Sequence, residues 1–285
     1  MRDVPISIVT CVLNQREDHF LACAKSVSAL AADVEWIVVD DGSSDEFKRK
    51  CDNILGEIPE TLPIKKINLA KNVGLSAARN SGISISQGNW IVVLDSDDEL
   101  MPDTVTILRS LDRDTALACF GVEYLKTDGT IETRTNTRWC RLFQRYALTV
   151  ADPFLWFDFY YHGIIARRET IEAIGGYRNR LVVGEDQDIL LRACEYLRAD
   201  NISFIDRLGY RYRENPFGVC ETRWSEVEEN YASTMIEAAK RRGASFDACR
   251  LANERNIDGA LVDEYEYRLK GRWIRWNEMV GHDVF

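Results

Sequence analysis

Histidine is scarce in this sequence, and its cysteines are scattered. Only three histidines occur, and the eight cysteines include no Cys-x-x-Cys pair. This spacing disfavours both a structural zinc site and a dense disulfide framework. Free thiols in a reducing compartment are the better interpretation.

Long apolar runs are also lacking. No window approaches 18 uninterrupted apolar residues, so the sequence predicts no membrane-spanning helix. The first residues lack the charged segment and long apolar segment that are typical of a signal peptide. We therefore expect a cytoplasmic protein with at most peripheral membrane contact.

An excess of positive charge is missing as well. Lys and Arg number 36 against 46 Asp and Glu, which gives a formal net charge of -10. A chain without surplus cations is poorly suited to neutralise phosphate backbones, so we expect no nucleic-acid partner. A small anionic ligand held locally by a metal ion remains compatible with this balance.

What is present is an alternation of strand-like and helix-like segments, which is typical of βαβ units and a largely parallel sheet. We expect strands over residues 6–12, 35–39, 64–69, 90–94, 116–124 and 164–167, and helices over 18–30, 74–85, 169–174 and 186–196. The predicted fold class is α/β: a Rossmann-like, mostly parallel sheet flanked by helices.

The 285 residues allow one large domain or two modest ones. We expect one α/β domain over residues 1–215 and a helical C-terminal extension over 216–285. In that extension Val262, Tyr265, Leu269 and Trp273 recur at helical spacing. Such an apolar stripe needs a partner, which is either the chain's own α/β domain or a second copy in a homodimer.

Polar residues follow three of the predicted strands, at positions where packing of an apolar core does not explain them. Carboxyl ends of parallel strands meet at one edge of a sheet, where ligands bind. Clustered carboxylates there favour a divalent cation with hard oxygen ligands. A plain Asx turn after the second strand and a helix cap formed by Asp98 or Asp103 are the alternatives. The residues are Thr10 and Asn14, then Asp40 and Asp41, then Asp95, Ser96, Asp97 and Asp98.

Four sequence blocks, in this order and spacing, resemble the nucleotide-sugar-binding half of family 2 glycosyltransferases with the GT-A fold. The blocks are residues 7–10, 37–45, 72–82 and 94–98. The resemblance implies that residues 1–100 bind a nucleotide sugar and 101–215 bind an acceptor. It also implies transfer of a hexose from a nucleoside-diphosphate sugar, with UDP as the expected nucleotide, to a hydroxyl of a glycan or small molecule, as in polysaccharide biosynthesis.

The resemblance further implies roles at the donor site. Asp41, or its neighbour Asp40, would accept a hydrogen bond from the uracil, and the backbone of Thr10 would line the same pocket, with Asn14 and Ser96 nearby. Arg79 would face the diphosphate as a fixed cation. In the D-x-D motif Asp97 would ligate Mn²⁺ or Mg²⁺, and Asp95 would hold the ribose or the metal's water.

A second acidic group lies at residues 185–188. Carboxylates at a helix start can simply complement the helix dipole, which is a plausible account of Asp188. The resemblance instead singles out Asp186 as the general base of an inverting transfer, with Glu185 as the rival.

Two positions concern the metal and remain open. His162 is expected near the donor sugar and metal, although a lone histidine is more often structural. Many relatives carry a histidine shortly after the Tyr-Arg pair that ends the domain, whereas this chain has Glu214 and Asn215 there. Either Glu214 substitutes for that histidine as a metal ligand, or this chain lacks the ligand.

Two other functions compete with glycosyl transfer. A sugar-phosphate nucleotidyltransferase would normally show a glycine-rich loop after the first strand, and residues 11–16 contain no glycine. A non-catalytic protein that binds a sugar nucleotide is disfavoured because Asp95, Asp97 and Asp186 are all present.

Overall fold

The protein is described from a computed structural model. Residues 6–30, 34–135, 164–179, 181, 184–197, 201–216 and 218 are described with their side chains where these are placed, and residues 266–269 and 272–275 by their backbone. The account below concerns these residues.

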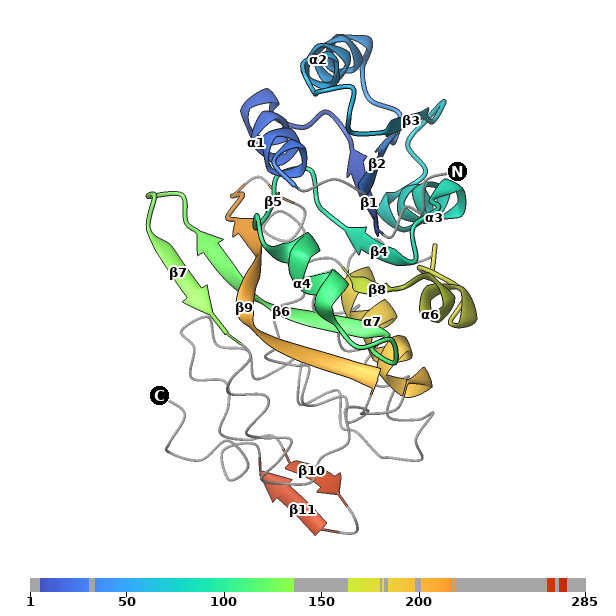
Figure 1. Cartoon of the computed structure of the whole chain (residues 1–285), viewed down its shortest axis with the longest axis vertical. Helices are drawn as coiled ribbons and strands as arrows, with labels where there is room; N and C mark the ends of the chain where they lie inside the picture. Colours follow the sequence, from blue (N-terminus) through green and yellow to red (C-terminus); the bar gives the residue numbers. More distant parts are fainter. Residues whose placement is uncertain are drawn as a thin grey trace.

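The first half of the chain builds a parallel sheet in which β1 lies between β2 and β4, and β3 forms the edge beyond β2 (Figure 1). Strands β1, β2 and β4 are short, rich in β-branched residues and buried, as parallel strands covered on both faces must be, whereas the edge strand β3 is only partly buried. The elements are β1 (Ile6–Val12), α1 (Glu17–Ser28), β2 (Val34–Asp40), α2 (Asp45–Gly56), β3 (Ile64–Asn68), α3 (Leu75–Ile85) and β4 (Trp90–Val93).

The second half continues the same sheet in the order β4, β8, β6, β9, β5, with β7 paired to β6 as a hairpin. β6 and β9 are parallel, while β8 is antiparallel to both of its neighbours. The mostly parallel prediction therefore describes the first half, and the second half is mixed. The elements are β5 (Glu99–Leu100), α4 (Thr104–Ser110), β6 (Leu117–Leu125), β7 (Ile131–Arg134), β8 (Ile165–Arg167), α6 (Arg168–Ala173), α7 (Glu185–Tyr196) and β9 (Ile202–Arg213).

Two apolar cores cover the two faces of the sheet. Helices α1, α2 and α4 pack on one face, and α3, α6 and α7 pack on the other. Helix α3 approaches the sheet through Gly82, where a methyl group would lie 2.5 Å from Cγ1 of Val9 and 3.0 Å from Cγ2 of Val39. A glycine is therefore required for this close helix–sheet contact.

Most of the predicted strands and helices are confirmed within a residue or two, but α2, α4, β5, β7 and β9 were not predicted. Helix α2 has Ser44 as its N-cap, with the hydroxyl accepting a hydrogen bond from the Phe47 amide. This capping serine was a usable signal. Strand β9 is twelve residues long and mixes exposed and buried positions, which obscured it.

The helical prediction for the C-terminal extension is wrong where the structure describes it. There, β10 (Glu266–Leu269) and β11 (Arg272–Arg275) form an antiparallel pair. Charged and apolar residues alternate over residues 266–269, and Lys270-Gly271 follows them, a sequence typical of a strand that ends at a turn. Leu269 and Trp273 lie on different strands rather than on one helical stripe. Nearly all of the other residues of the predicted extension, Val262 and Tyr265 included, lie outside the described part of the chain. The homodimer stays a prediction.

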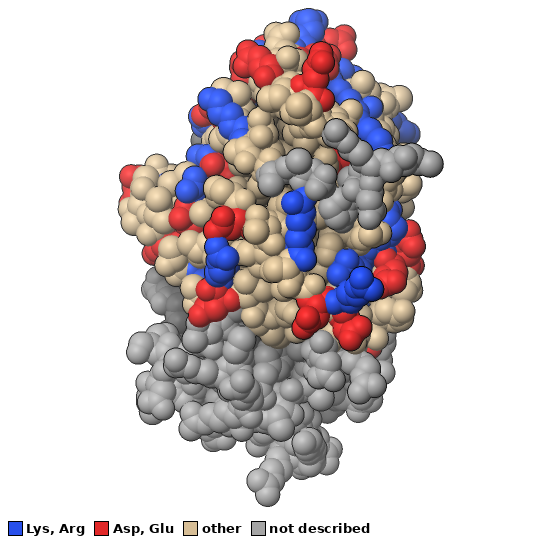
Figure 2. Space-filling view, in the orientation of Figure 1, with Lys and Arg blue, Asp and Glu red and all other residues tan. Residues whose placement is uncertain are grey.

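Charged side chains of both signs are interspersed over the described surface in Figure 2. On the edge strand β3, Lys65 forms an ion pair with Glu35 at 2.8 Å, and Lys66 pairs with Asp52. Charged side chains on an edge strand hinder pairing with another chain. Among the described helices, none is long and apolar enough to cross a membrane.

Candidate active site

The loops that follow β1, β2 and β4 meet at one edge of the sheet. Asn14, which has a φ of 46°, donates its amide N–H to the Ser43 hydroxyl (3.0 Å) and accepts from the Ser44 amide through Oδ1 (2.9 Å). Gln15 donates to the hydroxyl of Ser96 (3.1 Å). Asn14 and Ser96, both predicted site residues, thus help to connect the three loops into one surface.

The adjacent aspartates after β2 face different surroundings. Asp40 is fully buried on the face of β2 that carries Trp36 and Val38, and its Oδ1 accepts from the Ser43 amide (2.7 Å). Asp41 accepts from the amides of Val73 (2.7 Å) and Gly74 (3.0 Å). Asp41 therefore orients the loop before α3, and of the two candidates for the base contact it lies on the α3 side.

Thr10 contributes its side chain to the core. Its Oγ1 accepts from the Trp36 indole N–H at 3.0 Å, and the residue is fully buried. Its side chain is therefore not available to a ligand, and the role of its backbone in the base pocket stays a prediction.

Arg79 occupies the centre of a carboxylate cluster. Its Nη1 lies 2.7 Å from both Oε1 of Glu185 and Oδ1 of Asp186, and its Nη2 lies 2.6 Å from Oδ1 of Asp95. The guanidinium also covers the ring of Tyr177 at 5.1 Å. The prediction that Arg79 faces a diphosphate is corrected, because the side chain is 1% exposed and its charge is directed to three carboxylates.

This cluster joins the two predicted halves of the site. Asp95 follows β4, whereas Glu185 and Asp186 begin α7, about ninety residues later in the chain. One guanidinium for three carboxylates leaves an excess of negative charge. Burial raises the pKa of Asp186 to about 8; the charge of Arg79 opposes this shift, and the charges of Glu185 and Asp95 add to it. Burial likewise raises the pKa of Glu185 against the opposing charge of Arg79.

Helix α3 also holds the segment that leads into α7. Asn80 donates to the Tyr177 carbonyl (2.8 Å) and accepts from the Tyr177 amide (2.9 Å), and the Ser76 hydroxyl donates to the Leu181 carbonyl (3.1 Å). The Tyr177 hydroxyl lies 3.3 Å from Oδ1 of Asp186. Sequence reasoning missed Tyr177 and Asn80, although Asn80 lies inside the block that carries the family resemblance.

Asp188 has a structural role. Its carboxylate pairs with Arg192 at 2.7 Å and with Arg178 at 3.1 Å, and it is 1% exposed. Arg192 in turn donates to the carbonyls of Ile174 and Gly176. The carboxylate thus fixes the loop before α7 rather than merely complementing the helix dipole, and it is not a candidate base.

The D-x-D loop carries a second group of carboxylates. Burial, then the neighbouring charge of Asp95, raises the pKa of Asp97 above its ordinary value. Asp98 is 1% exposed, and burial raises its pKa well above the usual range, with Asp97 and Asp95 adding to the effect. Asp98 accepts from the Tyr210 hydroxyl at 2.8 Å, so it supports the loop from within.

The chemistry of this loop fits a divalent cation in part. Arg79 engages Oδ1 of Asp95 and Asn215 engages Oδ2 of Asp97 (2.9 Å), so each carboxylate keeps a second oxygen for another partner. No group of three potential metal ligands occurs among the described residues, so a cation held here would draw its remaining ligands from the substrate and water. His162 lies outside the described residues.

The side chain of Glu214 contacts the turn between β6 and β7 and does not take the place of a metal-ligand histidine. Its Oε2 accepts from the Thr127 amide (2.9 Å) and hydroxyl (3.1 Å), which ties it to the turn between β6 and β7. The residue of this segment that reaches the D-x-D motif is Asn215.

Comparison with known proteins identifies the family. A model of glycosyl transferase family 2 matches residues 7–175, which is more than half of the chain. The chain belongs to glycosyl transferase family 2. The match spans β1 to α6 and includes the D-x-D loop and Arg79, whereas Asp186 lies beyond it.

Curated relatives and solved structures agree with this assignment. The cholesterol galactosyltransferase of Borreliella burgdorferi is 24% identical over 267 residues, covering 86% of this chain and 70% of that protein. The succinoglycan biosynthesis protein ExoO of Rhizobium meliloti is 34% identical over 98 residues, covering 34% of this chain and 27% of the relative. The match thus spans about a quarter of that relative's length.

Among solved structures, S. aureus TarS 1–349 in complex with UDP-GlcNAc resembles this protein with a TM-score of 0.62. The identity is 16%, and the match covers 88% of this chain and 71% of that one. At this identity the likeness concerns the fold. It confirms the expected GT-A type of α/β architecture.

Proposed function

We propose that this protein is an inverting, metal-dependent glycosyltransferase that moves a hexose from a UDP-sugar to a hydroxyl of a glycan or small-molecule acceptor. The observation that carries the proposal is the Arg79 cluster. It brings the D-x-D carboxylate Asp95 and the acid pair Glu185 and Asp186 onto one guanidinium. Membership of the family and the TarS complexes with UDP and UDP-GlcNAc support the choice of donor.

Asp186 is the proposed base. Its side chain is 19% exposed, whereas that of Glu185 is 8% exposed, so Asp186 is the more accessible of the pair. A pKa of about 8 makes its carboxylate a stronger proton acceptor than an ordinary aspartate. In the proposed step this carboxylate takes the acceptor's hydroxyl proton while the hydroxyl oxygen bonds to C1 of the sugar. The bond from C1 to the diphosphate breaks, its electron pair leaves with UDP, and the configuration at C1 inverts.

Asp95 and Asp97 are the residues that would hold a Mn²⁺ or Mg²⁺ ion together with the donor's phosphates. When bound, the ion supplies positive charge to the departing diphosphate. The protein's own part is to position the two carboxylates. Arg79 fixes one oxygen of Asp95, and Asn215 fixes one oxygen of Asp97.

The test combines a donor panel with metal removal. The purified protein is offered nucleotide sugars with Mn²⁺, and release of the nucleoside diphosphate is followed with and without a chelator. We expect release from a UDP-sugar that EDTA abolishes, and that Asp97→Ala abolishes without unfolding the protein. Full turnover in EDTA would contradict the metal requirement.

The stereochemical outcome is read from the product. The proton coupling at the new anomeric centre should report the configuration opposite to that of the donor. Retention would overturn the single-displacement mechanism while leaving the donor site intact. Binding of UDP-sugars without any turnover would favour the non-catalytic alternative.

A further inference from the structure

The end of strand β9 shapes the D-x-D loop from the opposite half of the sheet. The Tyr210 hydroxyl accepts from the Asp95 amide (3.2 Å) and donates to Oδ2 of Asp98 (2.8 Å). The Arg213 amide donates to Oδ1 of Asp98 (2.8 Å), and its Nε donates to the Asp97 carbonyl (3.1 Å). These four bonds fix the backbone of the loop and the inner carboxylate of Asp98.

None of those bonds acts on the carboxylate of Asp97, the side chain proposed to bind the metal. That contact comes from the half-buried Asn215, two residues beyond β9, whose Nδ2 lies 2.9 Å from Oδ2 of Asp97. An amide N–H that fixes one oxygen of a carboxylate also sets the direction of the other oxygen. Arg79 acts in the same way on Oδ1 of Asp95, as a cation rather than a neutral amide.

We propose that Asn215 is a positioning residue for Asp97, and that its amide orients Oδ1 of that carboxylate toward the divalent cation. The inference rests on the proposed function, because it presumes that Asp97 binds the metal. The donor at this place is a neutral amide, which holds the carboxylate without adding a charge to it.

A purely structural role for Asn215 makes a different prediction. Its carbonyl accepts from the Gly218 amide at 2.8 Å, so the residue also belongs to the turn after β9. If the side chain served only that turn, its loss would lower thermal stability and leave metal affinity unchanged. Metal affinity is therefore the measurement that separates the two roles.

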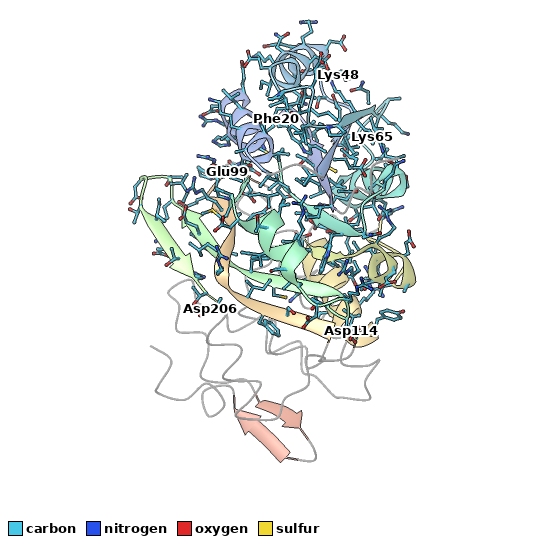
Figure 3. The ribbon with its side chains drawn as sticks, in the orientation of Figure 1. Phe20, Lys48, Lys65, Glu99, Asp114 and Asp206 are labelled. Carbon is cyan, nitrogen blue, oxygen red and sulfur yellow. The ribbon has the colours of Figure 1, made fainter. Side chains whose placement is uncertain are left out.

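The chain offers a matched control at the other end of β9. Asn201 precedes the strand, and its Nδ2 donates to the carbonyl of Asp114 at 2.8 Å. Figure 3 shows Asp114 at the end of the sheet away from Glu99, which follows the D-x-D loop. Asn201→Leu therefore removes a side-chain amide hydrogen bond of similar length at the other end of β9, far from the proposed metal site.

The experiment titrates Mn²⁺ alone into the full chain and follows free Mn²⁺ by electron paramagnetic resonance. We expect Asn215→Leu to weaken Mn²⁺ binding 10- to 100-fold, the usual range for residues that orient a metal ligand. The metal-free melting temperature should change no more than in Asn201→Leu, which should bind Mn²⁺ like the wild type. Asn215→Ala removes the same donor without added bulk and serves if the leucine variant fails to fold.

Wild-type Mn²⁺ affinity in the folded Asn215 variants, with binding lost in Asp97→Ala, would overturn the positioning role and leave the proposed function standing. Wild-type affinity in Asp97→Ala would overturn the metal assignment itself, and the role of Asn215 with it.

Discussion

At the amino-terminal edge of the sheet, the buried Glu35 accepts hydrogen bonds from the Ser7 hydroxyl (2.6 Å) and the Gln87 amide and pairs with Lys65 (2.8 Å). Burial raises its pKa, but these three donors outweigh burial and hold the pKa below its usual value. At the carboxyl edge a single guanidinium serves three carboxylates, and the pKa of Asp186 rises to about 8.

The difference separates carboxylates with a structural role from those that we propose to act on a ligand. Three donors of the protein surround Glu35, and Asp188 pairs with the two cations Arg178 and Arg192, so the protein itself compensates the charge of each carboxylate. Asp95, Asp97 and Asp186 are not, because the protein leaves an excess of negative charge where a cation and a substrate proton would compensate it.

The largest expected effect is on catalysis at the carboxyl edge of the sheet, where one guanidinium serves three carboxylates. Asp186→Asn keeps the shape of the side chain and removes its ability to accept a proton, so transfer should fall about 10²- to 10⁴-fold. Donor affinity should stay near the wild-type value, which separate turnover and binding measurements would show. Glu185→Gln is the matched comparison and should lose less. A fully active Asp186→Asn would shift the base to Glu185.

Removal of the shared cation should be costly for folding. Arg79→Met leaves three neighbouring carboxylates without their guanidinium, and the free energy of unfolding should fall by about 3–5 kcal/mol. Denaturant unfolding of the metal-free protein measures this change. Because Arg79 is 1% exposed, a loss below about 1 kcal/mol, the range of a surface ion pair, would mean that the carboxylates relax apart easily.

Neutral substitutions should act in opposite directions at the two edges. Glu35→Gln removes a charge that its donors stabilise, so the free energy of unfolding should fall by about 1–3 kcal/mol. Asp186→Asn removes a charge that its surroundings oppose, so the metal-free protein should melt at a higher temperature above pH 8. Thermal melts of both variants at pH 8.5 test the comparison. Destabilisation of both to the same extent would contradict it.

The last expected effect is a slope of stability with pH, of at most about 1.4 kcal/mol per pH unit for a single group. The pKa of Asp186 is about 8 in the folded protein and about 3.9 in an unfolded chain. Between these values the native state binds more protons, so its stability should fall as pH rises from about 4 to about 8. Melting temperatures of the metal-free protein across this range would show the slope. It should be shallower in Asp186→Asn, and an equal slope would assign it to other groups.

The first half of the fold could be predicted because its signals are local. Apolar runs such as residues 6–12 end at polar residues, and this pattern located the strand ends and the D-x-D loop. The partners of Arg79 could not be predicted in the same way. Residues 79 and 186 are far apart in the sequence, and only the packing of α3 against α7 decides whether that charge meets a ligand or a carboxylate.

The second half was harder to predict for a related reason. Strand β9 pairs with the distant β6 through a register shift at Phe120 and Gly121, and its exposure alternates irregularly. Its contribution to the site, through Tyr210 and Asn215, depends on that register. The sequence therefore offered Glu214 rather than Asn215 as a replacement for the missing histidine, and it gave no indication of a role for Tyr177.

Gly82 determines how closely α3, and with it Arg79, can approach the sheet. It lies three residues after Arg79 on α3, and the helix rests on Val9 and Val39 at a separation that one added methyl group would exceed. Because Arg79 lies on the same helix, this helix–sheet separation also fixes the position of the guanidinium that contacts Asp95, Glu185 and Asp186. The distance between Arg79 and the sheet therefore depends on Gly82, a residue without a side chain or a charge. A survey of polar contacts alone would not identify this residue.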